Sequence, residues 1–165
     1  MTTEVLSAET TVPAPAYEVF RVLTDPSQHA AIDGTGWVCE PLEGDQLTAS
    51  AQVFHMGMHH PNHPNGRYET ANKVREFDPP HAISWATGTE NPEGQVSFGG
   101  WVWRYDLKET PEGDTQVRLT YDWSAATPQA REAIGFPPFG VEHLTTSLQH
   151  LAGLATPPHV RPHRK

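Results

Sequence analysis

Two stretches of alternating apolar and polar residues, joined by a run of turn-forming residues, stand out in this sequence. They span residues 101–107 and 117–123, and in both of them every second side chain is large and apolar. A period of two is typical of a β-strand that buries one face. The connecting residues 109–114 include proline, glycine and aspartate, which favour turns. We therefore expect an antiparallel hairpin whose apolar face carries Trp101, Trp103, Tyr105, Leu107, Val117, Leu119, Tyr121 and Trp123.

The same alternation, over shorter runs, predicts strands elsewhere in the chain. These strands are expected at residues 5–12, 37–42, 47–58, 68–77 and around 83–85. Apolar residues spaced three or four apart predict helices instead. The helices are expected at residues 15–24, in a short turn from residue 25, at 127–134 and at 139–155. Asp25 and Thr127 each precede a proline, so both are expected to cap the helices that follow them.

The order of these elements predicts an α+β fold. One strand, two short helices and about six further strands precede a long final helix. A sheet with that many strands twists, and the twist lets it curl around a single helix. The last helix carries an apolar stripe that includes Leu144 and Leu148. It is long enough to lie across the concave face of the sheet.

Length and charge limit the classes of protein to consider. A chain of 165 residues supports one domain, expected at residues 1–156, followed by a flexible basic tail at 157–165. The net charge is −9, from 11 basic and 20 acidic residues, so a nucleic-acid partner has no electrostatic support. Cys39 is the single cysteine, which excludes an intrachain disulfide. With neither a signal peptide nor a membrane span in the sequence, we expect a cytoplasmic protein; no pattern indicates an oligomeric state.

Several segments resemble the START-like (SRPBCC) superfamily, and the resemblance spans nearly the whole chain. The segments TTVPAP at 10–15, VFRVLTDP at 19–26, VREFDPP at 74–80 and ISW at 83–85 are similar to its strand ends, first helix and middle strands. WRYDL at 103–107 and TYDWS at 120–124 resemble its polyketide cyclase/dehydrase-like members.

The resemblance implies a helix-grip fold. In that fold an antiparallel sheet of about seven strands curls around a long C-terminal helix, with two short helices between strands one and two and a cavity between sheet and helix. Members of the superfamily include ligand carriers, hormone receptors, aromatic polyketide cyclases and chaperone-activator domains. They generally work without a metal, so the resemblance implies no cofactor.

An aromatic inner face is the first candidate for a binding site. Tryptophan and tyrosine carry polar tips that need partners, whereas a dry core favours leucine, isoleucine and valine. We therefore expect a cavity lined by aromatic rings, suited to flat, ring-containing or polyketone ligands; the alternative is a plain aromatic core. The expected rings are Trp85, Trp101, Trp103, Tyr105, Tyr121 and Trp123.

Polar residues at inward positions are the next candidates. Asn72 has the parity of an inward residue, and Gln52 shares its parity with Phe54 and Met56. An amide in an apolar pocket must find a hydrogen bond, either from a ligand or from the strand itself. His143, beside the leucine stripe of the last helix, is a candidate general base, with a solvated helix edge as the alternative.

The sequence supports a metal site, and a polar site at Asp33, less than it supports the aromatic cavity. Four histidines lie within nine residues, and imidazoles so close together are able to chelate zinc. They are His55, His59, His60 and His63. His55 and His59 have outward parity, however, and no carboxylate lies nearby at ligand spacing, so no metal site is predicted. Asp33, in a glycine-rich turn, is expected to be a simple turn residue or to lie at the mouth of the cavity.

Two functions of a ligand cavity remain open. In an enzyme of the cyclase/dehydrase type, Tyr105, Tyr121, Asn72 and His143 would act on carbonyls of the ligand. The ligand contacts would be Gln52, Phe54, Met56, Trp85, Trp101, Trp103, Trp123, Leu144 and Leu148. In a carrier or sensor of a lipid-like metabolite, binding alone suffices, and the connection at 88–100, with Phe98 among glycines, is a candidate gate.

One feature weakens the enzyme hypothesis, and a third alternative remains open. A cyclase pocket usually holds a charged group. Here Arg104, Asp106, Arg118 and Asp122 have outward parity and are expected to pair across the solvent face of the hairpin. The third alternative is a protein-interaction module of the chaperone-activator type, which needs no ligand; in the other two cases the partner is a small hydrophobic molecule.

Overall fold

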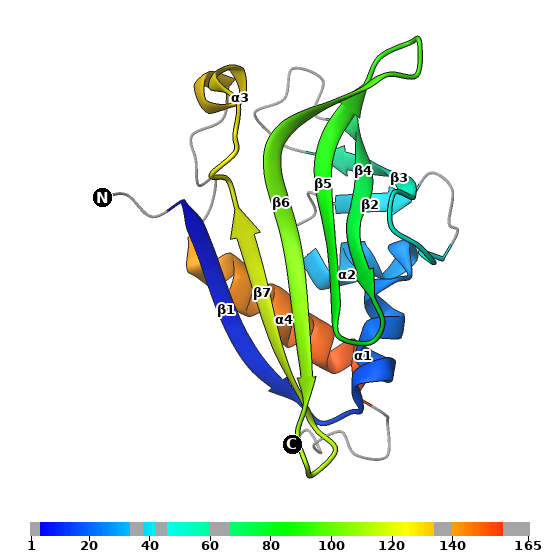
Figure 1. Cartoon of the computed structure of the whole chain (residues 1–165), viewed down its shortest axis with the longest axis vertical. Coiled ribbons are helices and arrows are strands. Elements are labelled where there is room, and N and C mark those ends of the chain that lie inside the picture. Colours follow the sequence, from blue (N-terminus) through cyan, green and yellow to red (C-terminus); the bar gives the residue numbers. More distant parts are fainter. Residues whose placement is uncertain (1–3, 34–37, 42–45, 60–66, 134–139, 157–165) are drawn as a thin grey trace.

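The computed structural model describes residues 4–33, 38–41, 46–59, 67–133 and 140–156. It shows one antiparallel sheet in the order β1-β7-β6-β5-β4-β3-β2, with α1, α2 and α4 on one side of it and α3 beyond the end of β7 (Figure 1). The α+β arrangement of a curled antiparallel sheet and a C-terminal helix is therefore confirmed. The strands are β1 Val5–Val12, β2 Val38–Pro41, β3 Val53–His59, β4 Arg67–Asp78, β5 Ala82–Glu90, β6 Val96–Glu109 and β7 Thr115–Asp122. The helices are α1 Ala16–Leu23, the 3-10 turn η1 Pro26–Gln28, α2 His29–Asp33, α3 Pro128–Ala133 and α4 Val141–Ala155.

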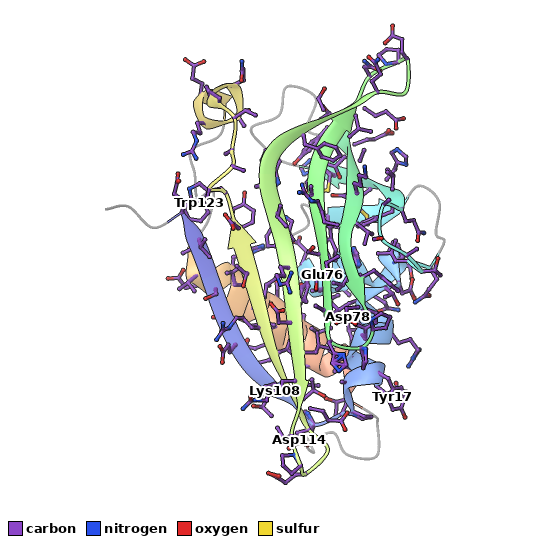
Figure 2. The ribbon with its side chains drawn as sticks, viewed as in Figure 1. Tyr17, Glu76, Asp78, Lys108, Asp114 and Trp123 are labelled. Atoms are coloured by element: carbon purple, nitrogen blue, oxygen red, sulfur yellow. The ribbon has the colours of Figure 1, made fainter. Side chains whose placement is uncertain are left out.

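The central hairpin has the register that the alternating pattern requires. In β6 and β7, Trp103 pairs with Tyr121 and Tyr105 pairs with Leu119. The side chains of both pairs lie on the face that packs against the core. Figure 2 shows that Trp123 lies just past the end of β7, at the opposite end of the sheet from the β6–β7 turn. The predicted hairpin and its buried face are confirmed.

Helix α4 closes the concave face with its leucine stripe. Leu144, Leu148 and Leu151 have no accessible surface, because α4 lies across β1 and β7 and packs against α1 and α2. Aliphatic side chains buried in this way supply most of the stabilisation of a small domain. The helix therefore fixes the sheet and the short helices relative to one another.

Both predicted helix caps are confirmed. Asp25 Oδ1 accepts a hydrogen bond of 3.0 Å from the Ser27 amide at the start of η1. Thr127 Oγ1 accepts one of 3.1 Å from the Ala130 amide at the start of α3. These bonds satisfy amides that have no partner inside the helix.

The strand predicted at 47–58 begins only at Val53. Residue Ala51 has a positive φ of 69°, which interrupts the extended chain. The Gln52 amide closes the preceding loop instead of facing a cavity: Oε1 accepts from the Thr48 amide at 2.8 Å, and Nε2 donates to the Gln46 carbonyl at 3.2 Å. These loop bonds engage both ends of its amide, so they match the alternative of a side chain satisfied by the strand and its loop; the ligand contact by Gln52 stays a prediction.

The connection predicted at 88–100 is largely paired strand. Gly88 pairs with Phe98 and Glu90 pairs with Val96, so only residues 91–95 form the turn, at the tip of a ribbon that extends beyond the rest of the sheet (Figure 1). A Cβ at Gly88 would lie 2.3 Å from the Ser97 carbonyl oxygen. The glycine therefore marks a close approach of two strands rather than a loop. The gate function of this segment stays a prediction.

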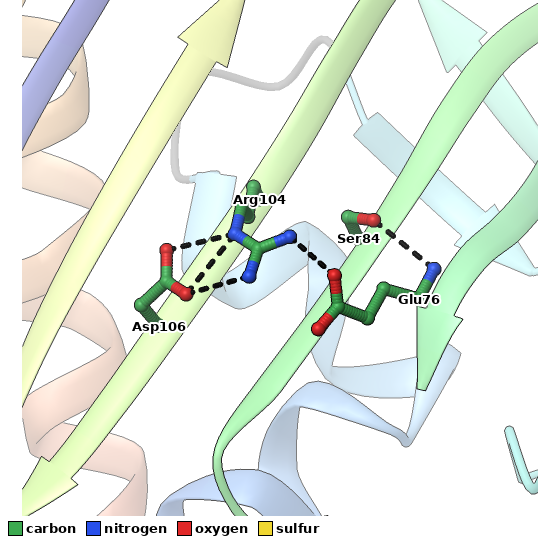
Figure 3. Close-up of polar contacts among 4 residues, drawn as sticks. All are labelled: Glu76, Ser84, Arg104 and Asp106. Carbon is green, nitrogen blue, oxygen red and sulfur yellow. Dashed lines mark hydrogen bonds and ion pairs between the residues drawn. The ribbon is translucent and has the colours of Figure 1, made fainter. Parts of the chain in front are cut away.

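The convex face carries a network of charged residues centred on Arg104. Its guanidinium reaches Asp106 on the same strand at 2.9 Å and Glu76 on β4 at 2.6 Å, as Figure 3 shows. The Glu76 amide, next to an irregularity of β4, donates to Ser84 Oγ at 3.1 Å. These ion pairs are partly exposed, so each stabilises the fold only slightly.

Partners of the hairpin charges differ from the prediction. Arg118 pairs with Glu9 on β1, and Asp122 Oδ1 accepts from the Ser124 amide at 2.9 Å. The outward orientation is right, but the pairing across the hairpin is wrong. Sequence alone does not show that β1 and β4 lie within reach of these arginines.

Candidate functional site

Three partly exposed tryptophans lie on the inner side of the sheet. Trp85 and Trp103 are direct cross-strand partners on β5 and β6. They and Trp101 are partly buried and pack against the core, whereas Tyr105 and Tyr121 are buried. Trp103 and Tyr121 are in ring contact, with centroids 4.6 Å apart. The aromatic surface thus combines rings that pack together with indoles that retain accessible area.

A histidine that the sequence did not indicate lies against Trp85. The His29 ring, at the start of α2, stacks on the indole with centroids 5.2 Å apart and planes 14° apart. Phe54 meets the edge of the same indole at 5.6 Å, and Tyr105 lies at 6.0 Å. Trp85 is therefore surrounded by three rings from α2, β3 and β6.

A hydrogen bond fixes the orientation of His29. Its Nε2 lies 2.9 Å from the Leu23 carbonyl oxygen, at the end of α1. Burial lowers the pKa of His29 more than this bond and Asp25 raise it. The imidazole is therefore neutral near pH 7.

Asp33 and His143 join the end of α2 to the first turn of α4. Asp33 Oδ1 lies 3.6 Å from His143 Nε2, and their side chains are 10% and 12% exposed. The His143 ring also meets Trp103, with centroids 6.3 Å apart. His143 is therefore not on a solvated helix edge, and Asp33 is more than a turn residue; the role of His143 as a general base stays a prediction.

Burial sets the charge state of the ionisable groups around this pair. It lowers the pKa of His143 more than the Asp33 carboxylate raises it. It also raises the pKa of Tyr105, with a further contribution from Asp33, and raises the pKa of Tyr121. At neutral pH the site therefore offers a neutral imidazole and two neutral phenols.

Asn72 is held by the protein on both sides of its amide. Its Nδ2 donates to the Phe54 carbonyl at 3.3 Å and to Thr70 Oγ1 at 3.2 Å. Thr87 Oγ1 donates to its Oδ1 at 2.8 Å. The inward parity of Asn72 is confirmed, and these bonds match the alternative of a strand side chain satisfied by its neighbours. Its predicted catalytic role stays a prediction.

The remaining predicted ligand contacts belong to the packed core. Their side chains have almost no accessible surface, so in this structure they support the site from behind. A fully buried side chain has no area to offer a ligand until the packing around it changes. These residues are Phe54, Met56, Trp123, Leu144 and Leu148.

The histidine-rich segment is described only in part. His55 Nε2 lies 3.0 Å from Glu90 Oε1 on β5, a carboxylate that spacing along the chain did not reveal. His60 and His63 lie outside the described residues. Within the described part of the chain, no three histidine, cysteine or acidic side chains gather as metal ligands.

We expect His29 to make the stability of the protein depend on pH. Its pKa is below the ordinary value of 6.5 in the folded state, so the unfolded state binds the proton first as the pH falls. The contribution is complete above pH 6.5 and is lost below it, at up to about 1.4 kcal/mol per pH unit. Urea denaturation between pH 7.5 and 5 measures this slope.

A matched pair of variants assigns that slope to His29. His29→Gln should flatten the pH dependence, whereas exposed His81, replaced in His81→Gln, should leave it unchanged. Equal slopes in both variants and the wild type would contradict the assignment. His143, whose pKa is also lowered, contributes with the same sign.

Among the helices that the structure describes, none is long and apolar enough to cross a membrane. No curated protein sequence matches this chain. Solved structures with the same fold share little sequence with it. Protein CV1439 from Chromobacterium violaceum is 17% identical, with a TM-score of 0.66 over 93% of this chain and 99% of that one. Protein Ms6760 from Mycobacterium smegmatis is 16% identical, with a TM-score of 0.63 over 92% and 90% of the two chains.

The match to a family model is more informative than these distant structures. The model described as "Polyketide cyclase / dehydrase and lipid transport" matches residues 3–155. This span contains all the strands that the structure describes and the whole of α4. The chain therefore belongs to the polyketide cyclase / dehydrase and lipid transport family of the START-like superfamily.

Proposed function

We propose that this protein binds a flat, ring-containing hydrophobic molecule between the concave face of the sheet and α4. The partial exposure of Trp85, Trp101 and Trp103, on the side of the sheet that packs against the core, carries this proposal. Indole faces left open to solvent inside a curled sheet favour a stacked aromatic or polycyclic guest. The family, which is described by polyketides and lipids, supports a hydrophobic ligand.

The polar groups beside these indoles favour a ligand that also carries oxygen. Tyr105 is 5% exposed and borders Trp85, and the Asp33–His143 pair borders Trp103. A purely aliphatic guest would leave these groups without the water that otherwise solvates them, at a cost in binding free energy. Ring systems with hydroxyl or carbonyl substituents avoid that cost.

Acid–base catalysis on such a ligand is the second candidate function, and the Asp33–His143 pair favours it. A neutral imidazole held beside a carboxylate is able to accept a proton, and the carboxylate stabilises the imidazolium that forms. Tyr105 and Tyr121, as neutral phenols, would donate hydrogen bonds to the oxygen of an enolate. A carrier or sensor of a lipid-like metabolite would need the aromatic surface alone.

Binding of the neutral fluorescent probe N-phenyl-1-naphthylamine tests the proposal. We expect saturable binding with quenching of tryptophan emission, and a dissociation constant raised about two- to tenfold in Trp103→Leu, because a stacked pair of rings is worth about 0.5–1.5 kcal/mol. Fluorescence titration at fixed protein concentration measures both.

Tyr17→Leu is the control for this titration, because Tyr17 is 63% exposed on α1, away from Trp103. It should bind the probe as the wild type does. No saturable binding, or equal affinity in Trp103→Leu, would instead support an interaction module with a filled core. Conversion of a bound ketone by the wild type but not by Asp33→Asn would assign catalysis to the same site.

A further inference from the structure

Two polar atoms beside Trp85 have no hydrogen-bond partner in the part of the chain that the structure describes. They are the Nδ1 atom of His29 and the hydroxyl of Tyr105. The two side chains are 8% and 5% exposed, and both rings lie within 6.0 Å of the Trp85 ring, centroid to centroid. A buried polar atom without a partner is costly, so each of these atoms calls for an explanation.

Both side chains lie beside an indole that keeps accessible area. Trp85 is only partly buried, and it packs against the core on the inner side of the sheet. A guest that covers this indole would therefore lie next to His29 Nδ1 and the Tyr105 hydroxyl.

The hydrogen bond to the Leu23 carbonyl fixes which nitrogen of His29 carries the proton. A carbonyl oxygen only accepts hydrogen bonds, so Nε2, at 2.9 Å from it, must carry the ring proton. In a neutral imidazole the other nitrogen then has a free lone pair. Nδ1 is consequently a hydrogen-bond acceptor, and a hydroxyl or N–H group of a ligand is able to donate to it.

Tyr105 offers the complementary group. Its phenol keeps its proton because burial raises the pKa of Tyr105, so its hydroxyl is able to donate to an oxygen of a guest. The amide of Asn72, in contrast, is already engaged by Thr70, Phe54 and Thr87. Among the described residues around Trp85, the acceptor of His29 and the donor of Tyr105 are left for a guest.

We propose that His29 and Tyr105 recognise a hydroxyl group on an aromatic or enolic ring that lies against Trp85. The ligand hydroxyl donates to His29 Nδ1, and its oxygen, or a carbonyl next to it, accepts from the Tyr105 hydroxyl. This inference rests on the proposed function and adds the chemical class of the ligand: a flat phenol or enol rather than a fatty acyl chain or an unsubstituted hydrocarbon.

Two probes of nearly equal shape test this inference. 2-Naphthol has the ring hydroxyl, and 2-methoxynaphthalene replaces its proton by a methyl group that cannot donate. We expect 2-naphthol to bind the wild-type protein about tenfold more tightly, because one hydrogen bond to an otherwise unsatisfied buried acceptor is lost with the methyl ether. Isothermal titration calorimetry at pH 7 measures both affinities.

Two substitutions of His29 separate its two nitrogens. His29→Gln keeps a donor near the Nε2 position and loses the acceptor, so the preference for 2-naphthol should fall to less than about threefold. His29→Asn keeps an acceptor near the Nδ1 position and should retain most of the preference. Tyr105→Phe should weaken both probes, because the oxygen of each accepts from the Tyr105 hydroxyl, and should leave the preference for 2-naphthol largely in place. His81→Gln, at an exposed position, is the matched control.

The outcomes distinguish the two proposals. Equal binding of both probes to the wild type would overturn the role of His29 and Tyr105 while leaving the aromatic binding site in place. Binding of neither probe would overturn both. A ¹⁵N correlation spectrum of histidine-labelled wild-type protein adds a test that needs no variant: it should show His29 protonated at Nε2, and protonation at Nδ1 would overturn the inference.

Discussion

Replacing Leu148 with alanine is expected to lower the free energy of unfolding by about 2–5 kcal/mol, because it removes a fully buried leucine from a closely packed interior. Leu148 has no accessible surface and lies in the middle of α4, between the helix and the sheet. The loss combines the apolar contacts of the side chain with the cost of the cavity that it leaves. Urea denaturation followed by far-UV circular dichroism measures it.

Two controls show whether packing is responsible. Leu148→Met conserves volume and should cost less than about 1.5 kcal/mol. Thr146→Ala, on the exposed side of the same helix, should change stability by about 0.5 kcal/mol at most. If Leu148→Ala were as stable as Thr146→Ala, this position would be a loosely filled ligand contact, as the sequence predicted, rather than part of the core.

The alternating pattern predicts the fold well because the sheet itself imposes it. In β6 and β7 successive side chains point alternately to the core and to solvent, so the inward positions of Tyr105 and Leu119 follow from spacing alone. The same rule fails for Gln52. Its parity matches that of Phe54, but Ala51, the residue before it, has a positive φ that interrupts the extended chain. No side-chain pattern reveals that turn.

The site is harder to predict because its members come from distant parts of the chain. His29 looks like a polar residue in a short helix, and only the fold shows that its ring lies on Trp85. Asp33 reads as a turn residue until α4 brings His143 to 3.6 Å from it. One signal was available: a histidine directly after a capped 3-10 turn and before an apolar segment is placed where a helix meets the core.

The arrangement also explains why an aromatic inner face is compatible with a stable protein. The aliphatic stripe of α4 supplies buried area on β1 and β7, on one side of the concave face. The partly exposed indoles of Trp85 and Trp103 lie on β5 and β6. The aliphatic packing of α4 and the indoles of Trp85 and Trp103 thus lie on different strands, so substitutions of these indoles are expected to change binding more than folding.

Gly100→Ala is expected to be as damaging as the loss of a core leucine, for a different reason. Gly100 has a φ of +101°, and a Cβ there would lie 2.0 Å from the Ala125 carbonyl oxygen. The loop that follows β7 is bonded to this point, since the Thr127 amide donates to the Gly99 carbonyl at 2.8 Å. Backbone strain and displacement of that loop together should lower the free energy of unfolding by about 2–6 kcal/mol.

Gly94→Ala is the matched control, because it isolates backbone strain from steric overlap. Gly94 has a φ of +84°, yet its Cβ would meet nothing within 4 Å, so we expect a loss of only about 1–2 kcal/mol. Urea denaturation of both variants measures the difference. Equal losses would mean that the Ala125 loop moves aside freely. A larger loss in Gly100→Ala would show that the loop is held against β6 beside Trp101, and with it the end of the aromatic surface that we assign to the ligand.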